Sequence, residues 1–166
     1  MPLYRTLIAA SVAGLMGFAG AAQAADGESH QSEVIACLSK MDAGTTWDQC
    51  RTKMFEPCAE EEVGSEPHLA CLEVQNKAWQ DQVDASIAEL NTKLTPDATG
   101  QLNELLDQWF GYLKGKCEAV ATEKAGISAA AAGLGCEISE FAGLATEFNS
   151  CLIGKSESPY CELKKE

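Results

Sequence analysis

Eight cysteines are the side chains of this 166-residue chain with the clearest capacity for chemistry. A cysteine thiolate can ligate a metal, carry out thiol-disulfide exchange or be oxidised to a structural disulfide. Zinc sites and redox enzymes usually contain two cysteines separated by two residues, and this chain has no such pair. An even number of widely spaced cysteines in a small chain is typical of a disulfide framework. We therefore expect four disulfides, no metal and no cofactor. The cysteines are Cys37, Cys50, Cys58, Cys71, Cys117, Cys136, Cys151 and Cys161.

The spacing of the eight cysteines does not determine how they pair. We favour a bridge from Cys117 to Cys136, which would tie the long central helix to the last one, and a bridge from Cys151 to Cys161 at the tail. The first four cysteines fit either sequential pairs or a nested hairpin, and both alternatives stay open. Each bridge is expected to contribute about 2 to 4 kcal/mol, largely by restricting the unfolded chain.

Other reactive side chains are few. His30 and His68 are the two histidines, and nothing in the sequence places a nucleophile beside either of them. We interpret both as surface residues and predict no enzymatic activity. A cluster of three glutamates, Glu60, Glu61 and Glu62, is either a solvated loop or a contact for a basic partner.

The N-terminus has the pattern of a secretory signal peptide. Arg5 is followed by an apolar run and then by Ala22-Gln23-Ala24, a small-x-small cleavage pattern. We predict cleavage after Ala24, with residues 1–24 as the signal peptide and 25–166 as a single cysteine-rich domain. The predicted location is the periplasm or the extracellular space, where disulfides form and persist.

The chain is strongly acidic. Its formal net charge is -13, and removal of residues 1–24 takes away Arg5 and no acid, which leaves -14. Such a charge repels nucleic acid and anionic membrane surfaces and speeds association with cationic partners. No later segment has the roughly 18 apolar residues of a membrane span, so we expect no membrane insertion.

Apolar residues recur at helical spacing along most of the chain. The clearest amphipathic stretches run over about 67–94 and 101–123, and the turn-forming residues 95–100 between them predict an antiparallel helical hairpin. A third helix is predicted to begin near residue 138 and to end at Gly154, and shorter helices are predicted over 32–40 and 47–56. The alanine- and glycine-rich stretch 126–135 fits either a loop or a weak helix. The predicted fold is all-α, a small disulfide-stapled bundle built on the hairpin, with these core residues: Leu72, Trp79, Leu90, Trp109, Leu113 and Leu144.

An ordered set of motifs resembles the lysozyme inhibitor LprI-like N-terminal domain family, over about residues 50–152. The matching stretches are Cys71-Leu72 through Trp79, Leu90-Asn91, Trp109-Phe110-Gly111-Tyr112 with Cys117, Gly126-Ile127-Ser128, and Cys136. The chain departs from the family at a usual glutamine, where it has Leu106, and at two arginine positions, where it has Leu113 and Leu144. These changes replace polar contacts beside the core with apolar ones.

The resemblance implies a secreted acidic protein that binds a cationic enzyme such as lysozyme and blocks it. The alternative is a structural or envelope-associated periplasmic module with another partner and no inhibitory activity, which the arginine-to-leucine departures favour. Binding to a basic protein that weakens with salt would distinguish the first function from the second.

Overall fold

The computed structural model of the protein describes residues 30–41, 45–154 and 159–163. Within these ranges the chain forms helices and no β-strand, and all eight cysteines are paired. The predicted all-α, disulfide-linked bundle is therefore confirmed. The predicted signal peptide, residues 1–24, lies outside the described residues.

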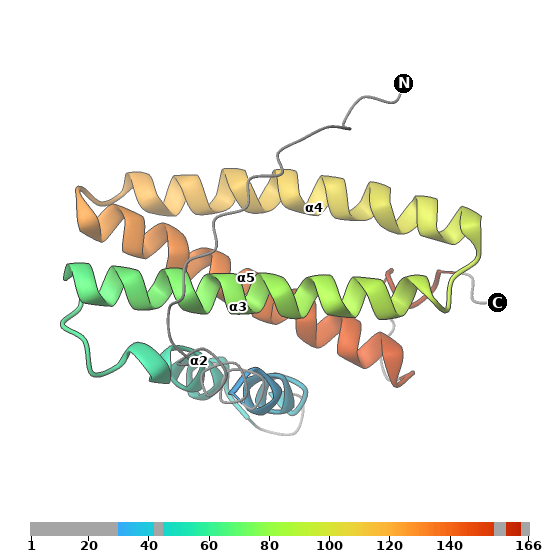
Figure 1. The fold of residues 1–166 in the computed structure, drawn as a ribbon, viewed down its shortest axis with the longest axis horizontal. Helices are drawn as coiled ribbons and strands as arrows, with labels where there is room; N and C mark the ends of the chain where they lie inside the picture. Colours follow the sequence, from blue (N-terminus) through green and yellow to red (C-terminus); the bar gives the residue numbers. More distant parts are fainter. Residues whose placement is uncertain (1–29, 42–44, 155–158, 164–166) are drawn as a thin grey trace, which may run out of the picture.

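Three long helices dominate the fold. A helical stretch over residues 30–38 is followed by α2 (Trp47–Phe55), the short 3-10 helix η2 (Glu56–Cys58), α3 (Glu66–Asn91), α4 (Pro96–Thr122) and α5 (Ile127–Leu152). Figure 1 shows α3 and α4 running antiparallel, as the sequence predicts, with α5 running obliquely from the end of α4 across α3. No helix of the described residues combines the length and the apolar character needed to cross a membrane.

Helix α5 is the central element of the bundle. Both α3 and α4 pack mainly against α5, and they approach each other closely at few points. The two arms of the hairpin are therefore held together mainly through α5. Because α5 contacts helices on two sides, apolar residues cover more of its surface than they do on α3, where the buried residues form one stripe.

Side-chain caps set where the long helices begin. The hydroxyl of Ser65 accepts a hydrogen bond from the backbone N–H of His68, and Thr95 likewise accepts from the N–H of Ala98. A proline at the start of each helix fits the first turn, where its missing N–H has no helical partner. Helix α4 therefore starts at Pro96 rather than near Gln101, because residues expected in the turn form its cap and first turn.

The alanine- and glycine-rich stretch before residue 138 is helical, so α5 starts at Ile127. Alanine has the highest helix propensity, and the small side chains allow close approach to α4. A Cβ built at Gly133 would lie 3.6 Å from the Cβ of Ala121. Gly126, with φ of 60°, provides the left-handed turn that separates α4 from α5.

Five of the six predicted core residues are buried, and the largest of them is Trp79, with no exposed surface. The other four are Leu72, Leu90, Leu113 and Leu144. Trp109 differs from the prediction because it is only half-buried. Its ring lies at the edge of the α4–α5 contact, where it packs against Phe110 and Phe141 instead of being enclosed.

Four disulfides link neighbouring segments. The structure contains the two favoured bridges, Cys117–Cys136 and Cys151–Cys161. The first four cysteines pair sequentially, as Cys37–Cys50 and Cys58–Cys71, which settles the alternative between sequential and nested pairs.

Candidate functional site

Residues of α3, α4 and α5 line a groove of about 570 Å³, which we call the acidic groove. It is the first candidate for a binding site because three helices contribute to it and its lining combines aromatic rings with charge. Its lining residues are Gln80 and Asp84 from α3, Phe110, Leu113, Lys114 and Glu118 from α4, and Glu137 and Phe141 from α5.

Aromatic side chains form the apolar part of the groove. Phe110 is 42 % exposed, which is high for a phenylalanine, and its ring centroid lies 6.3 Å from that of the buried Phe141. Trp109 supports both rings from the side, at centroid distances of 5.1 Å to Phe110 and 5.6 Å to Phe141. These tilted and edge-to-face contacts hold the exposed ring in place at the surface.

Three carboxylates and one ammonium line the same groove. Lys114 lies 4.0 Å from Glu118, and both side chains are mostly exposed, so this pair is weak. Asp84 and Glu137 make no ion pair with a described residue. The side-chain amide of Asn76, buried on α3, donates a 2.7 Å hydrogen bond to Glu137 and so orients that carboxylate. The lining therefore carries net negative charge.

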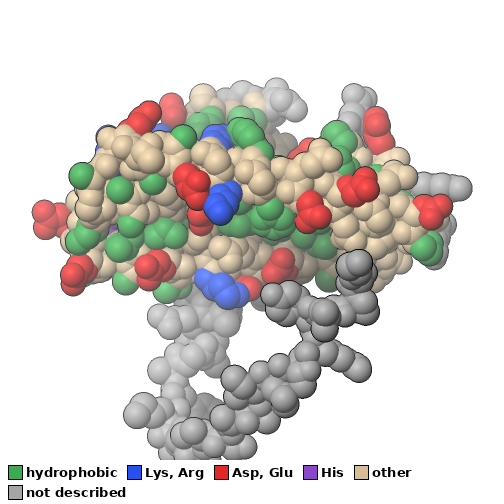
Figure 2. Space-filling model, turned by 90° about the horizontal axis from the view of Figure 1, so that it is seen from above, with side chains coloured by type: hydrophobic (Ala, Val, Ile, Leu, Met, Phe, Trp, Pro, Cys, Tyr) green, Lys and Arg blue, Asp and Glu red, His purple; other side chains and the backbone are tan. Residues whose placement is uncertain are grey.

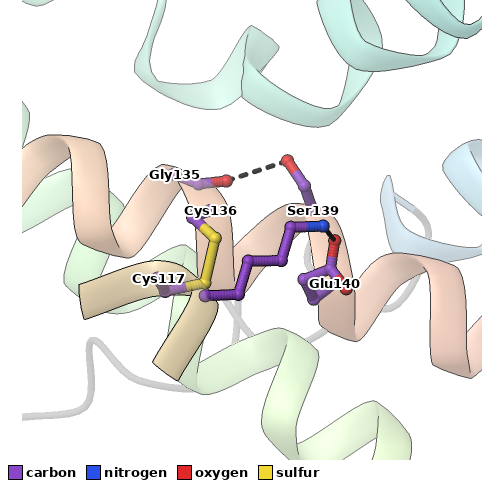
Figure 3. Close-up of polar contacts among 6 residues, drawn as sticks. Cys117, Gly135, Cys136, Ser139 and Glu140 are labelled. Atoms are coloured by element: carbon purple, nitrogen blue, oxygen red, sulfur yellow. Dashed lines mark hydrogen bonds and ion pairs between the residues drawn. A yellow bond between two sulfur atoms is a disulfide. The ribbon is translucent and has the colours of Figure 1, made fainter. Parts of the chain in front are cut away.

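The Cys117–Cys136 disulfide, shown in Figure 3, joins α4 to α5 next to two of these carboxylates in the sequence. Glu118 follows Cys117 on α4, and Glu137 follows Cys136 on α5. The bridge holds the two Cα atoms of the cysteines 5.4 Å apart, so it also keeps the two glutamates on adjacent helices near each other. Because successive helical residues turn by about 100°, Lys116 and Glu118 project to opposite sides of α4.

On the other side of the bridge, Lys116 and Glu140 form an ion pair with a 2.7 Å contact (Figure 3). The hydrogen bond that the Lys116 ammonium donates to Glu140 raises the pKa of Lys116, and the charge of Glu140 acts in the same direction. Ser139, one residue before Glu140, donates its hydroxyl to the backbone carbonyl of Gly135 at 2.8 Å. The Lys116–Glu140 ion pair lies outside the acidic groove.

The glutamates singled out from the sequence do not reach the groove. Glu60, Glu61 and Glu62 are exposed in the loop between η2 and α3, inside the segment closed by the Cys58–Cys71 bridge. None of them makes an ion pair with a described residue. They remain a predicted contact for a cationic partner, separate from the groove.

The two histidines are half-buried, in contrast to the predicted surface positions. The Nδ1 atom of His68 accepts a 3.4 Å hydrogen bond from the backbone N–H of Gly64, and the Nε2 atom of His30 lies 3.5 Å from the carbonyl of Met54. These backbone partners explain why both rings lie against the protein. The described residues contain no group of three side chains that could hold a metal ion.

Sequence reasoning missed the groove residues Asp84, Phe110 and Glu137. All three lie outside the predicted apolar stripes, and Phe110 belongs to the family-like motif. The available signal was an apolar ring just off the stripe of α4, a position where burial is incomplete.

Comparisons with known proteins add no relative. No protein-family model, no curated protein and no solved structure matches the chain. The resemblance to the LprI-like family therefore stays a prediction that rests on the motifs.

Proposed function

We propose that the protein is an extracytoplasmic binding protein that receives a cationic segment of a partner protein in the acidic groove. The observation that carries the proposal is the combination, in one groove, of the exposed Phe110 ring and three carboxylates. An arginine or lysine side chain of a partner would stack on the ring and pair with the carboxylates, an interaction that supplies about 0.5 to 2 kcal/mol from the ring alone.

The charge of the whole molecule supports the same partner chemistry. The sequence has 25 acidic and 12 basic residues. On the face seen in Figure 2, acidic side chains are spread widely, basic ones are few, and hydrophobic side chains form a band through the middle. A field of one sign attracts an oppositely charged protein and raises the association rate, and salt screens it over about 8 Å at physiological ionic strength.

Four disulfides support an oxidising location such as the periplasm or the extracellular space, because cytosolic thiols are kept reduced. Lysozyme, the partner implied by the family resemblance, is a cationic secreted enzyme and is the first partner to test.

The test is inhibition and binding of a c-type lysozyme by the oxidised protein, titrated at low and moderate salt. The groove variant Asp84→Asn/Glu118→Gln/Glu137→Gln removes three negative charges and, at residue 137, keeps a carbonyl that can accept from Asn76. The matched control Glu73→Gln/Glu104→Gln/Asp107→Asn removes three charges from exposed helical positions outside the groove. We expect the groove variant to weaken binding by at least about tenfold and the control by about twofold, since charge-assisted contacts are worth more than general attraction.

Two outcomes would contradict the proposal in different ways. Equal losses in the two triple variants would mean that overall charge, and not the groove, attracts the partner. A helical, thiol-free protein that neither binds nor inhibits lysozyme at either salt concentration would exclude this partner and favour the envelope-associated module.

A further inference from the structure

A second hollow lies on the opposite side of α5 from the acidic groove. It has a volume of about 540 Å³ and adjoins a smaller hollow of about 370 Å³, with which it shares the lining residues His68, Ala131 and Ala132. We call the two adjoining hollows together the α2–α5 furrow. Glu137 lines the groove whereas Ser139 lines the furrow, as expected for residues about 200° apart around one helix.

Helix α2 supplies one wall of the furrow. Trp47, Arg51 and Phe55 recur at four-residue steps and so share one face of the helix. The other face carries Cys50 and Met54, both with no exposed surface, which fix α2 to the bundle. The wall facing the furrow therefore has a defined orientation, although Trp47 is 40 % exposed.

The floor of the furrow is made of small residues on α5. Ala131, Ala132 and Gly135 line it, and a Cβ built at Gly135 would lie 3.9 Å from the ring of Phe55. Larger side chains at these positions would fill the hollow. The result is a surface hollow with an apolar floor and an exposed tryptophan at its side.

Basic side chains outnumber carboxylates among the lining residues of this furrow. Its single lining carboxylate, Glu140, is already paired with Lys116 at 2.7 Å. Arg51 and Lys124 make no ion pair with a described residue. Because Nδ1 of His68 accepts from Gly64, the neutral ring carries its proton on Nε2, which is a further donor.

From these observations we propose that the furrow binds a single-chain amphiphile with a carboxylate head. The carboxylate pairs with the guanidinium of Arg51, for which the two-oxygen geometry is suited, and the alkyl chain lies along Trp47, Phe55 and the alanine floor. Burial of each methylene adds to the affinity, so a chain of moderate length can bind without a deep cavity. A cationic amphiphile has no free carboxylate to meet among the lining residues.

The test is a calorimetric titration of the oxidised protein with dodecanoate below its critical micelle concentration. We expect saturable binding of one dodecanoate molecule per chain. Dodecyltrimethylammonium has a dodecyl tail with a head of opposite charge, and acetate has the carboxylate head without the tail. We expect no saturable binding of either compound. Arg51→Gln is expected to weaken dodecanoate binding by about tenfold, since it removes a charge-assisted pair. Lys53→Gln is the matched control, because it removes one charge from the same helix at an exposed residue outside the lining, and it is expected to change the affinity less than twofold.

Tryptophan fluorescence tests whether the alkyl tail of dodecanoate lies beside Trp47. Dodecanoate should change the tryptophan emission of the native chain, and Trp47→Phe should abolish that change, because Trp79 and Trp109 lie elsewhere. The proposal is overturned if dodecanoate shows no saturable heat, if dodecyltrimethylammonium binds equally well, or if Arg51→Gln and Lys53→Gln have equal effects. The furrow would instead be assigned to a second copy of the chain if sedimentation shows that the native chain dimerises and that Trp47→Arg abolishes the dimer. In that case dodecanoate binding would be lost only because the dimer is lost.

Discussion

Removal of the Cys117–Cys136 bridge is the most informative perturbation of this fold. The bridge joins the last turns of α4 to the first half of α5, which has no side-chain cap at its N-terminus and is built largely from alanine and glycine. The variant is Cys117→Ala/Cys136→Ser. Alanine suits the buried position 117, where a serine hydroxyl would lose its water partners, and serine suits the partly exposed position 136.

The expected loss follows from the loop that the bridge closes. The sequence separation is 19, for which the chain-entropy relation predicts about 3.2 kcal/mol at 25 °C. The shortest bridge, Cys151–Cys161, has a separation of 10 and predicts about 2.7 kcal/mol by the same relation. For a domain of this size a loss of about 3 kcal/mol corresponds to a fall in Tm of about 10 °C.

Urea unfolding followed by circular dichroism measures both losses, with Cys151→Ala/Cys161→Ser as the matched control. Native-state hydrogen exchange then separates the two variants. Only removal of the Cys117–Cys136 bridge should speed exchange of the amides over 127–137, because this part of α5 depends on its link to α4. The reasoning is refuted if the Cys117–Cys136 variant is as stable as the native protein, or if both variants loosen 127–137 equally.

Three further changes have expected outcomes. Trp79→Ala should lower the free energy of unfolding by about 3 to 5 kcal/mol in urea titrations, because the ring is fully buried, and a loss below about 1 kcal/mol would contradict its place in the core. Ser65→Ala should cost about 1 kcal/mol in the same assay, since it removes the cap on the N–H of His68, whereas Ser65→Asp should cost little. Burial, with a smaller effect from Glu147, raises the pKa of Tyr160 above its ordinary value of 10.0, so the stability that the neutral phenol contributes is present below pH 10 and is lost as pH rises through the raised pKa. Unfolding of Tyr160→Phe between pH 8 and 12 should therefore show a smaller alkaline loss than that of the native chain, and identical pH profiles would exclude this effect.

The candidate site shows the limits of sequence reasoning. The sequence suggests a contact at Glu60, Glu61 and Glu62 because these three acids are consecutive. They lie, however, in an exposed loop away from the groove. Asp84 and Glu137 are 53 residues apart and become neighbours of one groove only through helix packing. No local pattern of spacing predicts that meeting, since it depends on how the helices cross.

Local patterns in the sequence were enough for the helical class, the five buried core residues, the hairpin order of α3 and α4 and the favoured bridges. Each of these follows from interactions between residues close in the chain: periodic burial, capping, turn formation and closure of short loops. Tertiary structure alone decided that α5 lies against both arms of the hairpin, that its alanine-rich start is helical, and that Trp109 remains half-exposed. These features depend on which helix fills the space between two others, and packing across the whole bundle determines that. The acidic groove and the α2–α5 furrow exist because α5 fills this space.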